Sequence, residues 1–181
     1  KLTARGMRHS RVKCTTQFIV GASDETDSEI MQYMFNLYNR LKFQRVYFSA
    51  YQKGFGNPDI PGEKRPVSNP AQSFMREHRL YQADFLVRRY GFSRDDILLD
   101  ASGNLRMDKD PKQIWADSHP EFYPVRLNRA DKEALLRVPG IGPDSASKIL
   151  KMRREMKILR IEDLGIKGKR LEKTKQYMIC E

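Results

Sequence analysis

Apolar positions at the start of the chain change from strand-like to helical spacing and back. Residues 15–22 are a short run rich in β-branched and aromatic residues that ends near Gly21, which predicts a buried strand. Helical spacing follows in two rows, Ile30, Met34, Leu37 and Leu41 beside Met31, Phe35 and Tyr38. Residues 45–51 predict a second strand. Strand, helix and strand in this order predict a parallel βαβ unit.

Two parallel strands do not make a stable sheet by themselves. We therefore expect further strands from a missing N-terminal part of the protein or from a partner chain. The sequence begins at Lys1 rather than at methionine, which also leads us to expect a fragment of a longer protein.

The middle of the chain predicts a loop followed by helices. Residues 52–70 are rich in glycine and proline and predict a long loop. A helix is expected around 77–90, where Gly91 ends it. The stretch 93–96 resembles a capping box and predicts a short helix, and Asp110 predicts the cap of another.

The most informative stretch is 136–150, which predicts two helices joined by a glycine turn. An apolar helix ends at Val138, the sequence Pro-Gly-Ile-Gly follows, and a second helix begins at Pro143, since proline suits the first helical position. Asn128 and Asp131 predict a cap pair for the first helix.

This turn predicts a site for a phosphate group. Its two glycines permit positive φ and a close approach of the backbone, and the free amides of a helix N-terminus favour an anion. Lys148, one turn further on, is expected to reach the same anion. The predicted contacts are Gly140, Ile141, Gly142, Asp144, Ser145 and Lys148.

A looser copy of the same turn lies at residues 165–168, where Gly-Ile-Lys-Gly echoes the first turn. It adds Gly165, Gly168 and Lys169 to the predicted phosphate contacts. Two such turns predict a four-helix unit with pseudo-twofold symmetry, and a plain pair of C-terminal helices is the alternative.

The positive net charge of the chain predicts a polyanionic partner. The net charge is +11, and residues 121–181 hold 15 basic and nine acidic residues. No apolar run approaches the ~18 residues of a membrane span, and no secretory signal is visible. With only two cysteines, Cys14 and Cys180, we expect a cytoplasmic protein without membrane contact and without a metal site of its own.

The Pro-Gly-Ile-Gly-x-x-x-Ala stretch resembles the helix-hairpin-helix motif, which grips DNA phosphates without reading bases. Together with residues 15–22 and 76–84, it makes nearly the whole chain resemble the C-terminal part of a bacterial family of DNA-modification or DNA-repair proteins. In that family a radical S-adenosylmethionine barrel precedes a helix-hairpin-helix tail. The resemblance implies an α+β or α/β fragment: the end of a partial TIM-type barrel and an all-α DNA-binding tail.

The resemblance also implies residues that face a cofactor. Late strands of such barrels often carry G-x-I-x-G-x-x-E, which Ile19 and Gly21 match, while Gln17 replaces the first glycine and Asp24 stands at the glutamate. The chain lacks the CxxxCxxC motif that holds the [4Fe–4S] cluster. We therefore expect S-adenosylmethionine and the cluster in the full-length parent and no cofactor in this chain.

The resulting hypothesis has three segments: 1–70 as the last β/α units of the barrel, 71–120 as a helical connector, and 121–181 as the DNA-binding tail. The tail is expected to bind DNA without sequence preference. One alternative is a helix-hairpin-helix DNA glycosylase, in which Asp163, 19 residues after Asp144, would be the catalytic aspartate. The other is a non-catalytic module whose hairpins bind protein.

Overall fold

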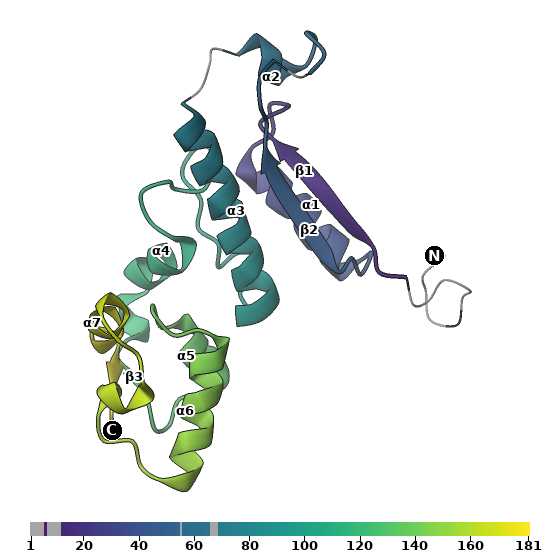
Figure 1. Ribbon diagram of the computed structural model, residues 1–181. Coiled ribbons are helices and arrows are strands. Elements are labelled where there is room, and N and C mark those ends of the chain that lie inside the picture. The colour runs from purple at the N-terminus through teal and green to yellow at the C-terminus, as the bar shows by residue number, and fades with distance from the viewer. Residues whose placement is uncertain (1–5, 7–11, 55, 66–68) are drawn as a thin grey trace. The chain divides into compact units, whose positions relative to one another are not determined.

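The computed structural model describes residues 6, 12–54, 56–65 and 69–181. Its described part is mixed α/β, with seven α-helices and two pairs of parallel strands (Figure 1). The chain divides into two compact units, Lys1–Asp84 with Leu99–Asp108 and Phe85–Leu98 with Lys109–Glu181. Both units therefore contain parts of the predicted connector 71–120.

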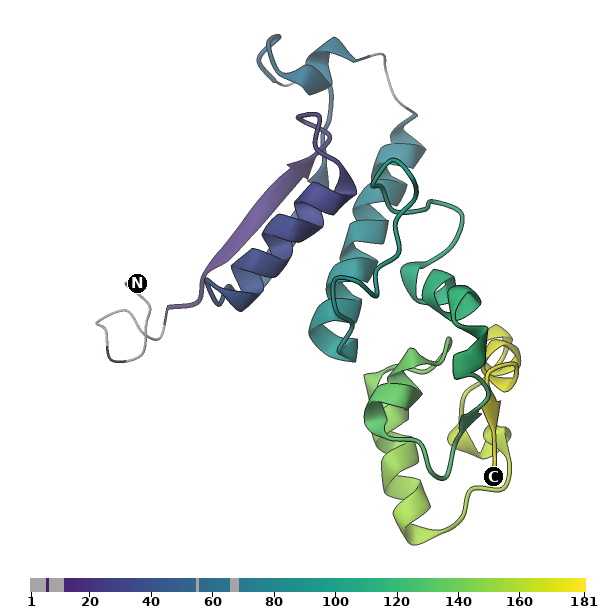
Figure 2. The same cartoon turned by 180° about the vertical axis from the view of Figure 1, so that it is seen from behind.

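The first unit contains the predicted parallel βαβ motif. Strands β1 (Thr15–Val20) and β2 (Arg45–Ala50) pair in parallel from Thr15↔Arg45 to Val20↔Ala50. Helix α1 (Asp27–Asn39) covers one face of this pair, as the view from behind shows (Figure 2). Within the described residues the sheet has these two strands and does not close into a barrel.

Helix α1 begins and ends at positions that the apolar pattern defines only roughly. Thr26 is its N-cap, in a capping box with Glu29. Ile30, Met31 and Met34 are buried as expected. Leu41 lies beyond the end of the helix at Asn39 and is 61% exposed, so its predicted place in the apolar stripe is wrong.

The outer edge of β2 is covered by side chains from two helices, α1 and α3 (Pro70–Tyr90), the second of which begins earlier than predicted. Three polar side chains accept the N–H groups of alternate strand residues. They are Tyr38 Oη for Val46 at 2.9 Å, Tyr81 Oη for Phe48 at 3.0 Å and Glu77 Oε2 for Ala50 at 2.7 Å. This edge is therefore closed to a further strand.

A buried carboxylate ties the segment Leu99–Asp108 to the rest of the first unit. Asp27 is completely buried and accepts the N–H of Leu105 at 2.8 Å. The same carboxylate accepts Arg76 Nε at 2.6 Å. The predicted loop 52–70 contains the short helix α2 (Pro61–Lys64), and Glu63 accepts the N–H groups of Gly54 and Gly56.

The second unit is built from short helices: α4 (Pro111–Ser118), η1 (Pro120–Phe122), α5 (Lys132–Arg137), α6 (Pro143–Glu155), η2 (Ile161–Leu164) and α7 (Lys169–Lys175). The prediction of an all-α tail is wrong, because β3 (Val125–Arg126) and β4 (Met178–Ile179) form a short parallel pair. The pair joins the segments that enter and leave the helices, where Val125 and Leu127 donate N–H groups to Tyr177 and Ile179.

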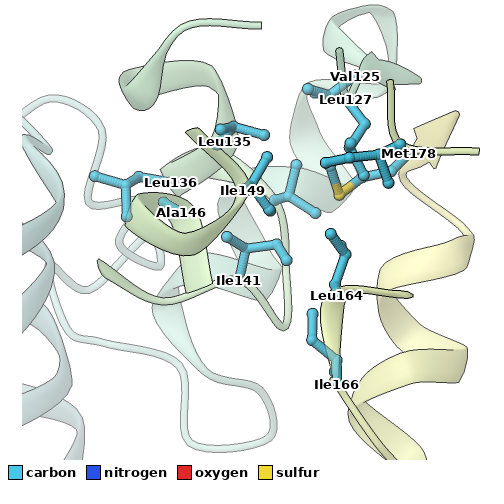
Figure 3. Close-up of a cluster of buried hydrophobic side chains, with 12 residues drawn as sticks. Val125, Leu127, Leu135, Leu136, Ile141, Ala146, Ile149, Leu164, Ile166 and Met178 are labelled. Carbon is cyan, nitrogen blue, oxygen red and sulfur yellow. The ribbon is translucent and has the colours of Figure 1, made fainter. Parts of the chain in front are cut away.

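A hydrophobic cluster of twelve buried residues lies in the second unit (Figure 3). Its side chains come from β3, α5, α6, η2 and β4 and from the segments between them. The buried members are Val125, Leu127, Leu135, Leu136, Val138, Ile141, Ala146, Ile149, Ile158, Leu164, Ile166 and Met178.

The predicted short helix at residues 93–96 does not form. Ser93 and Asp96 do exchange the hydrogen bonds of a capping box, but the chain makes only a turn. Asp96 instead accepts Trp115 Nε1 at 3.1 Å and pairs with Arg137 at 2.9 Å. Although burial opposes ionisation, the bonds from Arg137 and Ser93 lower the pKa of Asp96 to about 2.

Within the described residues, none of the helices combines the length and apolar character needed to cross a membrane.

The closed edge of β2 generates a stability prediction. Tyr81 Oη also donates to the carbonyl of Phe48 at 2.9 Å, so Tyr81→Phe removes two hydrogen bonds from one strand residue. We expect a loss of about 1–3 kcal/mol and an amide exchange of Phe48 that is at least ~5-fold faster by NMR. Tyr33→Phe, at a tyrosine that is 62% exposed, is the matched control. Equal exchange rates in both variants would show that the edge does not depend on Tyr81.

Candidate nucleic-acid interface

The hairpin loop, residues 139–142, joins α5 to α6 much as the sequence predicts. Val138 is the C-cap of α5, Gly142 is the N-cap of α6, and Pro143 is the first residue of α6. Ile141 enters the core and is 1% exposed, and its N–H donates to Val138 O at 3.1 Å. The apolar side chain therefore anchors the loop, and its backbone turns around that anchor.

The two glycines of the loop have different roles. Gly140 has φ +90°, and a Cβ there would collide with Thr174 Oγ1, so the backbone lies directly against α7. The predicted need for positive φ at Gly142 is wrong, because its φ is −109°. A Cβ at Gly142 would lie 3.3 Å from Tyr90 Oη, so close packing is the reason for a small residue there.

Two carbonyls of the hairpin loop accept hydrogen bonds from basic side chains that are distant in sequence. The donors are Arg170 Nη2 to Gly140 O at 2.9 Å and Lys112 Nζ to Ile141 O at 2.6 Å. Thr174 Oγ1 lies 3.3 Å from Pro139 O, but its one hydrogen is shared with the nearer Arg170 O at 2.8 Å. The carbonyls of Gly140 and Ile141 are therefore satisfied within the protein.

The amides at the start of α6 are the other side of the same loop. Ala146 N donates to Gly142 O at 2.8 Å as the first backbone bond of the helix. The N–H groups before it have no acceptor within the helix, and the helix dipole makes this end positive. Asp144 is exposed in this turn and Ser145 is half-buried. The Asp144 carboxylate opposes an incoming anion, whereas Ser145 does not.

Lys148, a predicted phosphate contact, makes a hydrogen bond within the protein. Its Nζ donates to Leu164 O at 3.0 Å, at the carbonyl end of η2. The Nζ lies 2.9 Å from the position that a Cβ of Gly165 would occupy. Lys148 is exposed and its ammonium has three donors, so its contact with a phosphate stays a prediction.

The second glycine turn is anchored like the first, by a buried isoleucine of its own. Gly165 and Gly168 have φ +73° and +59°, and Ile166 between them is buried in the same core. Lys169 is exposed as the first residue of α7. The element before this turn is the 3₁₀ helix η2, so the echo of the first hairpin is shorter than expected.

Lys112 is the part of this site that the sequence analysis missed. It is 8% exposed, and its Nζ lies 4.6 Å from the centre of the Tyr90 ring. Burial, only partly offset by the carboxylate of Asp110, lowers the pKa of Lys112 to about 7. Lys112 precedes the buried Trp115 and Ala116 by three and four residues, a spacing that places all three on one face of a helix. This spacing was the signal in the sequence that Lys112 is buried.

The predicted cofactor-facing residues separate into two groups. Gly21 and Asp24 line an open cavity of about 1150 Å³ at the carboxyl ends of β1 and β2. Asp24 pairs there with Arg65. Ile19 is not among the residues that line this cavity and is 47% exposed on β1. The structure therefore brings two of the three residues to the edge where parallel sheets bind ligands.

The remaining candidate residues lie apart from the hairpin loop and from the cavity. Asp163 is exposed in η2. Cys14 and Cys180 are free thiols in different units. In the part of the chain that the structure describes, no three His, Cys, Asp or Glu side chains come together as metal ligands.

Comparisons of the chain with protein-family models, curated proteins and solved structures found no match. The assignment of a function therefore depends on the chemistry of the chain's own residues.

The buried lysine generates a pH prediction. The unfolded chain keeps the Lys112 proton up to about pH 10.5, whereas the folded state loses it near pH 7. The free energy of unfolding should therefore rise from pH 6 to pH 9 by on the order of 2 kcal/mol through this residue. Lys112→Met should remove that rise. Trp115, the chain's one tryptophan, reports urea unfolding of the second unit by fluorescence.

Lys132→Met, at an exposed lysine of α5, is the control for this experiment. The relevant quantity is the difference between wild type and each variant, because other groups titrate in the same range. A pH dependence in Lys112→Met that equals the wild-type one would contradict the assignment.

Proposed function

We propose that the chain binds DNA without sequence preference through the hairpin loop and the N-terminus of α6. The observation that carries this proposal is the division of the loop into two sides. Side chains of Arg170 and Lys112 satisfy the carbonyls of Gly140 and Ile141, while the first amides of α6 have no acceptor within the helix. Amides at a positive helix end suit a phosphate, and phosphate contacts carry no base information.

The charge of the tail supports a polyanionic partner. Residues 121–181 hold 15 basic and nine acidic residues, and Lys167, Lys169 and Arg170 are exposed around the second glycine turn. Neutralising ~2–4 phosphates would make the binding weak and steeply dependent on salt. A protein partner held by apolar contacts would bind with little salt dependence, which separates the two hypotheses.

The first unit supports a place for the chain in a larger enzyme of DNA modification or repair. Its cavity at the strand ends holds Gly21 and Asp24, which fits the S-adenosylmethionine side of a radical enzyme barrel. The cluster-binding cysteines of such an enzyme are not in this sequence. In this proposal they belong to the other half of the barrel, and the tail delivers DNA to it.

The sheet itself supports the presence of such a missing half or partner chain. The β2 edge is covered by Tyr38, Tyr81 and Glu77, but no described strand pairs with the outer edge of β1. Ile19 and Tyr47 are 47% and 45% exposed on these strands. A further strand would therefore join on the β1 side.

Two charge changes in the first turn of α6 test the DNA proposal with opposite signs. Ser145→Glu introduces an acidic residue, which the N-terminus of a helix favours but which repels a phosphate. We expect affinity to fall about 5–10-fold and the slope of log affinity against log salt to flatten by roughly one. Asp144→Asn removes the natural repulsion and should raise affinity several-fold. Fluorescence anisotropy of labelled single- and double-stranded DNA across a salt series measures both.

Ala71→Glu is the matched control, since it places the same charge in the first turn of α3 in the first unit. It should leave binding unchanged. Trp115 fluorescence checks that the two α6 variants fold, and far-UV circular dichroism checks Ala71→Glu. Absence of wild-type binding at low salt would refute the proposal. Equal affinities of wild type, Ser145→Glu and Asp144→Asn would move the DNA contact away from the hairpin loop.

A further inference from the structure

We propose that residues 156–160, which follow α6, form an apolar wedge that inserts into the base stack of duplex DNA. The wedge consists of Met156 and Leu159. It lies at the opposite end of α6 from the hairpin loop, so it adds a second kind of contact. The inference rests on the proposed function only for the choice of DNA as the partner.

The wedge residues are unusually exposed for their type. Met156 is 67% exposed and Leu159 is 70% exposed, more than any other large hydrophobic side chain among the described residues. No helix or strand contains them, since α6 ends at Glu155 and η2 begins at Ile161. Both side chains are therefore open to contact with a partner.

The segment is held in place by its central residue. Ile158 is 2% exposed and belongs to the hydrophobic core. Its N–H donates to Asn128 Oδ1 at 3.0 Å, and its carbonyl accepts from Asn128 Nδ2 at 2.9 Å. Asn128 Nδ2 also donates to Cys180 O at 2.9 Å. The wedge is therefore preorganised, which lowers the entropy cost of inserting it into a partner.

Charge around the wedge selects a polyanion. Residues 151–160 contain five basic residues and one acidic residue, Glu155. Arg153 turns inward and donates to the carbonyls of Leu127 and Ala130. The other four basic side chains, Lys151, Arg154, Lys157 and Arg160, are exposed. A partner with negative charge outside and flat apolar surfaces inside fits this arrangement, as duplex DNA does.

The size of the patch separates DNA from a lipid surface. Interfacial membrane binding usually uses the whole apolar face of an amphipathic helix, and here two side chains stand alone. The length of α6 also suits one duplex. Its 13 residues span about 20 Å, or roughly six base pairs at about 3.4 Å each. The hairpin loop and the wedge are therefore separated by a distance that one duplex can span.

A duplex that contains 2-aminopurine tests the wedge, because this base becomes brighter when its neighbours unstack. We expect saturating wild-type chain to raise the fluorescence. The double variant Met156→Ser/Leu159→Ser should bind about ten-fold more weakly and leave the fluorescence at the free-duplex level even at saturation. Leu41→Ser, at a leucine that is 61% exposed in the first unit, should match wild type in both readouts.

The outcomes separate this inference from the DNA grip of the hairpin loop. Ser145→Glu should lose affinity and still raise the fluorescence at saturation. If the serine double variant lost affinity while Ser145→Glu bound as tightly as wild type, the wedge would stand and the hairpin grip would be refuted. Bound wild-type chain without brightening, or full brightening by the double variant, would overturn the wedge, and so would absence of wild-type DNA binding. Vesicles of phosphatidylserine and phosphatidylcholine complete the test, because loss of vesicle binding alone in the double variant would assign the surface to membranes.

Discussion

The hydrogen bond from Lys112 to the carbonyl of Ile141 is the contact on which the second unit's candidate site depends. Ile141 fills the core, which takes its carbonyl out of water and makes a donor necessary. Helix α4 supplies a lysine through its buried face, at 2.6 Å. The protein thus buries a basic side chain to satisfy the loop, and its pKa falls to about 7. This fixes the loop carbonyls in one direction and the amides of α6 in the other.

Local sequence chemistry was enough to predict the elements that organise each unit. Proline at the start of a helix, glycine in the turn and apolar residues at helical spacing placed the hairpin, and α6 begins at the predicted Pro143. The same kind of pattern predicted the parallel pairing of β1 and β2. These features depend on neighbours within a few residues, so a single sequence contains them.

Side chains with distant partners were beyond the same reasoning. Asn128 resembles a helix cap, yet it holds Ile158 and Cys180 because both lie beside it in the fold. Lys148 resembles a phosphate ligand, and in the fold its ammonium also binds the carbonyl of Leu164. In each case the local sequence suggests one partner for the side chain, while folding brings a distant backbone carbonyl within hydrogen-bonding distance of it. Cap residues in an isolated sequence are therefore ambiguous wherever the chain returns to them.

Backbone groups that find no side-chain partner indicate where the chain can bind a ligand or another strand. Several backbone groups that helices and strands leave unpaired are taken by side chains, as Asp27 does for Leu105 and Glu77 does for Ala50. Helix α6 begins without a side-chain cap, as α2 and α7 do, and no described strand pairs with the outer edge of β1. Open amides at a positive helix end suit an anion, and an open strand edge suits another strand. The proposed DNA contact of the second unit and the proposed completion of the sheet in the first unit therefore depend on different backbone groups.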